Sequence, residues 1–100
     1  MNKREQEILK RVVDILKEHL KPYKIILFGS RAKGIAHKNA DFDFAVDKKI
    51  VGTSEQREIM EEIEKVAGLY KIDIVYLDKI EQGFKNIVLK SGKVLYERGS

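Results

Sequence analysis

The chain of 100 residues contains no cysteine, which excludes a disulfide framework and a thiolate zinc site. It has no apolar run near the roughly 20 residues of a membrane-spanning helix. Its charged N-terminus lacks the apolar core of a signal peptide. No internal repeat, low-complexity tract or long linker divides the sequence. These absences predict one cytoplasmic globular domain over residues 1–100 with no membrane partner.

The sequence also lacks a strong excess of charge of one sign. The chain has 20 basic and 16 acidic residues, a net charge of +4, and the two signs are largely interleaved along the sequence. Interleaved charge is typical of a solvated surface, so the basic balance makes no strong case for direct nucleic-acid binding.

The most informative stretch is residues 27–46, LFGSRAKGIAHKNADFDFAV, where ten residues separate a Gly-Ser turn from two aspartates. Asp41 and Asp43 lie in an alternating run typical of a strand, which places both carboxylates on one face. Mg²⁺ prefers hard oxygen ligands and is commonly held by one or two carboxylates together with substrate phosphates. The pair therefore predicts a divalent-metal site completed by a phosphorylated ligand.

Upstream of the aspartates, Lys24–Phe28 is predicted to be a buried strand that ends at Gly29 and Ser30. A short helix over residues 31–33, ended by Gly34, is predicted to follow. Gly29 lets the backbone approach closely, Ser30 supplies a hydroxyl and an N-cap, and the helix N-terminus offers free N–H groups. We therefore expect this turn to bind phosphate.

Three basic residues adjoin this turn, namely Arg31, Lys33 and Lys38. Because they lie beside the phosphate-binding motif, we interpret them as a triphosphate-binding patch. Arg31 and Lys33 are the candidate nucleotide ligands, and the sequence does not decide which of the two points inward.

A third carboxylate, Asp73, interrupts the otherwise apolar run KIDIVYL at residues 71–77. Burying an unpaired acid would cost several kcal/mol, so a metal, a cation or a solvated cleft is expected to meet it. If this strand lies beside that of Asp41, three carboxylates converge on one sheet face. A purely structural role for Asp73 stays open.

The remaining segments are interpreted as scaffold. A first helix ended by Pro22 is expected to cover the sheet, and a second is expected to start with a capping box of Thr53 and Gln56 and to stop at Gly68. A third helix and a short strand over residues 93–96 are expected to follow. The helical spacing of the first segment is carried by Ile8, Leu9, Val12, Val13, Leu16 and Leu20.

Together, the Gly-Ser turn, the ten-residue spacing, the Asp-x-Asp pair and the later Ile-Asp-Ile resemble the nucleotidyltransferase superfamily that includes DNA polymerase beta. Within it, the chain is most similar to the minimal nucleotidyltransferase, or MNT, antitoxin group. The resemblance covers nearly the whole chain and implies an α+β fold, a mixed β-sheet with helices packed mainly on one face. One departure is Ala40, where many relatives have serine; this change removes no metal ligand.

The resemblance implies Mg²⁺-dependent transfer of AMP from ATP to a hydroxyl. Asp41 and Asp43 would hold two Mg²⁺ ions, with Asp73 joining the ion nearer the acceptor, and all three are the expected catalytic residues. Gly29 and Ser30 would cradle the β and γ phosphates. MNT antitoxins pair with HEPN-domain toxins, typically RNases, and some attach AMP to a toxin tyrosine. The expected partner is therefore a HEPN-domain toxin.

Two other functions stay open. One is a non-catalytic antitoxin that blocks its toxin by binding, although the complete set of three aspartates argues against a relic site. The other is nucleotidyl transfer to a small molecule or an RNA end, whose known relatives have added substrate-binding domains. A HEPN-domain reading frame beside that of this chain would favour the antitoxin hypothesis.

Overall fold

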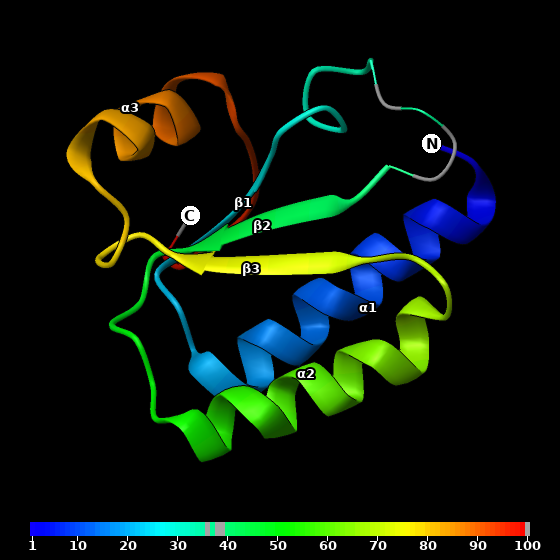
Figure 1. The fold of residues 1–100 in the computed structure, drawn as a ribbon, viewed down its shortest axis with the longest axis horizontal. Coiled ribbons are helices and arrows are strands. Elements are labelled where there is room, and N and C mark those ends of the chain that lie inside the picture. The colour runs from blue at the N-terminus through cyan, green and yellow to red at the C-terminus, as the bar shows by residue number, and fades with distance from the viewer. Residues whose placement is uncertain (36, 38–39, 100) are drawn as a thin grey trace.

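The computed structural model describes residues 1–35, 37 and 40–99 of the chain (Figure 1). Lys38 therefore lies outside the described residues. The predicted order of helices and strands is confirmed, except for the short helix after Ser30. In chain order the elements are α1 (Lys3–Leu20), β1 (Lys24–Phe28), β2 (Phe42–Val46), α2 (Thr53–Ala67), β3 (Ile72–Tyr76), α3 (Gln82–Ser91) and β4 (Lys93–Glu97).

The four strands form one mixed sheet in the order β3-β2-β1-β4. β1 is antiparallel to both β2 and β4, whereas β2 and β3 run parallel. β3 is consequently an edge strand, and its register places Asp73 directly opposite Asp43 on β2.

The main core lies between one face of the sheet and the pair α1 and α2 (Figure 1). Phe42 and Phe44 alternate along β2 into this core, where their rings stack with centroids 6.3 Å apart. The predicted packing of helices mainly on one face is confirmed. The fully buried side chains that α1 contributes are Ile8, Val12, Leu16 and Leu20.

α3 lies on the other face of the sheet, over a smaller core (Figure 1). Ile26, Ala45 and Val88 are buried there, and the Phe28 ring packs edge-on against Phe84 with centroids 5.7 Å apart. No helix in the described part of the chain is long and apolar enough to cross a bilayer.

The helix caps differ in part from those predicted. Thr53 is the first residue of α2, so the expected capping box with Gln56 is wrong. Gly52 occupies the N-cap position, and the Gln56 side chain donates to the Val51 carbonyl at 2.8 Å instead. α2 ends before Gly68, as predicted.

Candidate active site

Asp43 and Asp73 are register partners on the neighbouring parallel strands β2 and β3. Because their strand neighbours Phe42 and Ile72 face the α1 and α2 core, both carboxylates lie on the opposite face, which α3 only partly covers. The predicted convergence of the acids depended on these two strands being neighbours, and β2 and β3 are neighbours in the sheet. The fold thus brings two of the three predicted carboxylates together.

The environment of Asp43 raises the pKa of its carboxyl group above the ordinary value. Desolvation by burial is the largest cause, followed by the negative charges of Asp73 and Asp41 and by a side-chain hydrogen bond with Asp73. Lys71 opposes this effect, and its Nζ lies 4.0 Å from Asp73 Oδ1. Crowded negative charge of this kind is relieved by a bound cation.

Asp41 directly precedes β2 and is half-buried, and its charge reaches Asp43. Among the described residues, no group of three or more acidic, histidine or cysteine side chains is arranged to hold a metal by itself. The donor chemistry nevertheless fits Mg²⁺, which is usually bound by one or two carboxylates plus substrate phosphates. In such a site the carboxylates would supply some of the metal ligands, and the phosphates of a nucleotide would supply the rest.

Gly29 has a role that the sequence did not reveal. Its φ is +74°, and a Cβ built on it would lie 2.4 Å from Asp43 Oδ2. A side chain at this position would displace the carboxylate that faces Asp73. The glycine is therefore needed for the approach of Asp43, whatever its predicted role toward phosphate.

The helix predicted over residues 31–33 is absent, and hydrogen-bonded turns replace it. Lys33 N donates to the Gly29 carbonyl at 3.3 Å, and Ile35 N donates to the Ser30 carbonyl at 3.2 Å. The argument for phosphate binding from a helix N-terminus is therefore wrong here. Ser30 is half-buried and Lys33 exposed, and both stay predicted phosphate ligands.

Arg31 does not match its predicted role. The residue is buried, and its guanidinium donates to the Glu5 carboxylate at 2.8 Å and to the Ala40 carbonyl at 2.8 and 3.1 Å. A guanidinium that is buried and bound to Glu5 and to the Ala40 carbonyl does not face a phosphate. The sequence showed the charge of Arg31 but not its burial.

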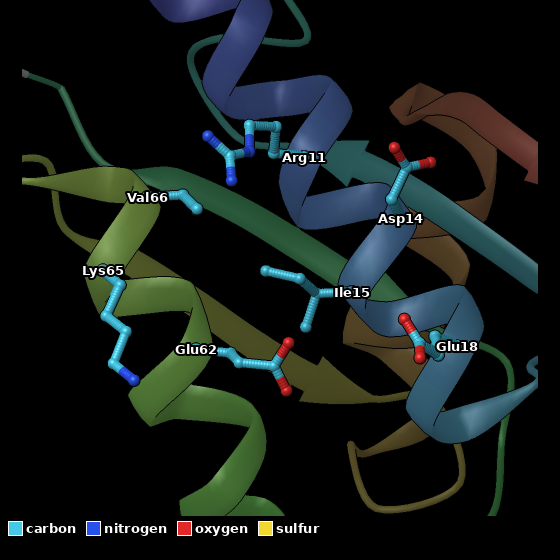
Figure 2. Close-up of a pocket in the computed structure, with 7 residues that line it drawn as sticks. All are labelled: Arg11, Asp14, Ile15, Glu18, Glu62, Lys65 and Val66. Carbon is cyan, nitrogen blue, oxygen red and sulfur yellow. The ribbon is translucent and has the colours of Figure 1, made fainter.

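Two grooves are lined by described residues of the chain. Figure 2 shows one between α1 and α2, with an apolar floor at Ile15 and a rim of mixed charge. A second groove runs between α2 and β3, and it includes Asp73 but neither Asp41 nor Asp43. Its lining residues are Gln56, Ile59, Met60, Ile72, Asp73, Ile74 and Tyr76.

We expect Gly29→Ala to lower affinity for Mg-ATP at least about tenfold, because its Cβ would displace the Asp43 carboxylate. Gly34→Ala is the matched control, since its φ of +73° imposes similar backbone strain but no atom lies within 4 Å of the added Cβ. Both variants should lose roughly 1 kcal/mol of stability. Calorimetric titration measures the affinities, and equal affinities for the two variants would contradict this role of Gly29.

The family described as polymerase beta, nucleotidyltransferase, matches residues 10–100. A candidate protein adenylyltransferase of Methanocaldococcus jannaschii is 37% identical over 73 residues, which is 70% of this chain and 72% of the relative. The protein adenylyltransferase MntA of Aphanizomenon flos-aquae is 38% identical over 84 residues, 73% of this chain. The match spans 55% of that relative, or about half its length.

Solved structures share the fold. A toxin-antitoxin structure with AMP-PNP superimposes with a TM-score of 0.77 at 24% identity, over 90% of this chain and 73% of the other. A complex of a tri-AMPylated Shewanella oneidensis HEPN toxin with an MNT antitoxin gives a TM-score of 0.71 at 21% identity, over 92% and 71%. At these identities the likeness concerns the fold alone.

Proposed function

Because the chain belongs to the polymerase beta nucleotidyltransferase family, we propose that it transfers AMP from Mg-ATP to a hydroxyl of a partner protein. The observation that carries the proposal is the pairing of Asp43 with Asp73 on adjacent strands, with Asp41 nearby. The proposed acceptor is a tyrosine of a HEPN-domain toxin, which makes the chain an antitoxin. The name of the MntA relative supports protein adenylylation. Residues 1–100 would act as one minimal nucleotidyltransferase domain.

In the proposed reaction, the acceptor oxygen attacks the α-phosphorus of ATP in line with the departing pyrophosphate. A bond forms from that oxygen to the α-phosphorus, and the bond from the α-phosphorus to the oxygen that bridges it to the β-phosphorus breaks. Pyrophosphate leaves with that bridging oxygen, and the hydroxyl proton passes to bulk water. Bound Mg²⁺ would lower the pKa of the hydroxyl and neutralise charge on the phosphates. Asp41 and Asp43 would hold two such ions, and Asp73 would hold the one nearer the acceptor.

The phosphates of the nucleotide are assigned to the turn that follows β1. The Gly29 backbone and the Ser30 hydroxyl would contact the β and γ phosphates, and Lys33 would neutralise part of their charge. Arg31 is left out of this set, since its guanidinium is bound to Glu5 and to the Ala40 carbonyl. The carboxylates of Asp43 and Asp73 would then face the acceptor on their solvent-exposed side.

The test is incubation of the chain with ATP, Mg²⁺ and a HEPN-domain toxin encoded beside it, followed by intact-mass measurement of the toxin. We expect mass increases of whole AMP units, lost with EDTA, and peptide mapping should place AMP on tyrosine. Asp73→Asn should retain most Mg-ATP binding and lose transfer by orders of magnitude. If wild type and Asp73→Asn suppress toxin RNase activity equally, without any mass change, a binding-only antitoxin replaces the enzyme.

A further inference from the structure

Arg31 lies in a buried network that joins α1 to the segment before β2. Its Nη1 donates to Glu5 Oε2 at 2.8 Å, and the two side chains are only 2% and 8% exposed. Its Nε and Nη2 both donate to the Ala40 carbonyl, at 3.1 and 2.8 Å. The planar guanidinium thus binds a carboxylate and a backbone carbonyl at once, which a lysine ammonium cannot match in geometry.

Glu5 is itself fixed by the cap of α1. Its Oε1 accepts a hydrogen bond from the Asn2 backbone N–H, and Asn2 Oδ1 accepts one from the Glu5 N–H, each at 2.8 Å. The two oxygens of Glu5 therefore have separate uses, one in the cap and one on Arg31. The hydrogen bond from Asn2 is the largest cause that holds the pKa of the Glu5 carboxyl group below its ordinary value, and the Arg31 guanidinium adds to it. The carboxylate is therefore charged at neutral pH.

The guanidinium also stacks on an aromatic ring. Its central carbon lies 4.0 Å from the centroid of the Phe42 ring and 5.5 Å from that of Tyr70. The Phe42 and Tyr70 rings meet edge to face at 5.6 Å. Arg31 therefore contacts the residue before Asp41, through the Ala40 carbonyl, and the residue after it, through the Phe42 ring.

We propose that Arg31 is a positioning residue for Asp41, acting through both of its neighbours in the chain. This inference rests on the proposed function, in which Asp41 is a metal ligand. Mg²⁺ demands near-ideal octahedral geometry, so a ligand on a segment without regular structure must be held in place. The Glu5 and Arg31 pair does this, and a small displacement of such a group can cost about a hundredfold in rate.

The test compares Arg31→Lys with Arg4→Lys. Arg4 is the matched control because it also donates to a backbone carbonyl, that of Val66, at 3.0 Å, but it is an exposed residue of α1. We expect Arg31→Lys to lower kcat for AMP transfer about a hundredfold and to raise the Mg²⁺ concentration for half-maximal activity. KM for ATP should change less than about threefold, and Arg4→Lys should match wild type. A KM raised tenfold with kcat and the Mg²⁺ midpoint unchanged would identify a phosphate ligand and overturn the proposal.

A second readout does not depend on transfer. Free Mn²⁺ measured by electron paramagnetic resonance gives the affinity of each variant for the metal alone, and Arg31→Lys should bind at least about fivefold more weakly than wild type. An unchanged Mn²⁺ affinity would overturn the role of Arg31, even if wild type transfers no AMP and the proposed function fails by itself. If Arg31→Lys does not fold, Glu5→Gln serves in the same assays, with a smaller loss in the same direction.

Discussion

Replacing Asp43 with asparagine is expected to reduce AMP transfer at least about a thousandfold, because Asp43 interacts with both of the other carboxylates of the proposed site. Asparagine keeps the size of the side chain and removes the charge that would bind metal in the proposed site. The measurement is the initial rate of AMP addition to the toxin by mass spectrometry. Asp47→Asn is the control, since Asp47 is exposed just beyond the end of β2, and it should keep the wild-type rate within about twofold.

The same variant should be more stable than wild type at neutral pH without divalent cations. The folded state raises the pKa of Asp43, so it binds the proton more tightly than the unfolded chain does. Ionisation of Asp43 therefore lowers the free energy of unfolding as pH rises through the raised pKa. Thermal melts in EDTA at pH 7 should give a higher Tm for Asp43→Asn, and the gain should shrink below pH 4. A lower Tm at pH 7, together with an unchanged transfer rate, would contradict the assignment of this carboxylate.

Gly92→Ala is expected to destabilise the fold by about 2 to 3 kcal/mol, which corresponds to a Tm lower by roughly 10 to 20 °C. Gly92 joins α3 to β4, and an added Cβ would lie 2.4 Å from Ile26 Cγ2, 2.5 Å from the Val88 carbonyl oxygen and 3.2 Å from that of Leu27. Two of these three atoms belong to the backbone, so the clash cannot be relieved by a change of rotamer. α3 or β4 must move.

Gly52→Ala is the control for this prediction, because no atom lies within 4 Å of a Cβ at that position. As Gly52 is the N-cap of α2, its replacement should cost less than about 1 kcal/mol. Urea denaturation of both variants gives the two free energies of unfolding. Equal losses would show that the close packing of Gly92 against β1 does not limit stability.

The strand of Asp43 was predictable because its alternation with apolar residues is local. The pairing of Asp43 with Asp73 was not, since the order of strands in a sheet depends on contacts between distant segments. Twenty-nine residues, including the whole of α2, separate these two acids in the chain. Sequence alone could propose convergence only on the condition that the strands were neighbours.

The burial of Arg31 was not predictable for a related reason. A basic residue beside a phosphate-binding motif favours a phosphate ligand, and nothing local indicates that its side chain is buried against Glu5. One signal was present, because asparagine followed three residues later by glutamate is typical of a helix N-terminus. It places Glu5 in the first turn of α1, but the tertiary contact with Arg31 still depends on packing.

β3 is an edge strand whose backbone groups on one side face away from β2. Exposed edges invite pairing between molecules, and proteins commonly prevent it with short strands and charges placed within them. β3 has only 5 residues, and Asp73 lies at its second position, after Lys71 at the approach to the strand. If two copies met edge to edge, the negative charge of Asp73 on each copy would oppose the new sheet. The carboxylate proposed for chemistry thus also disfavours pairing of this edge with the sheet of a second copy.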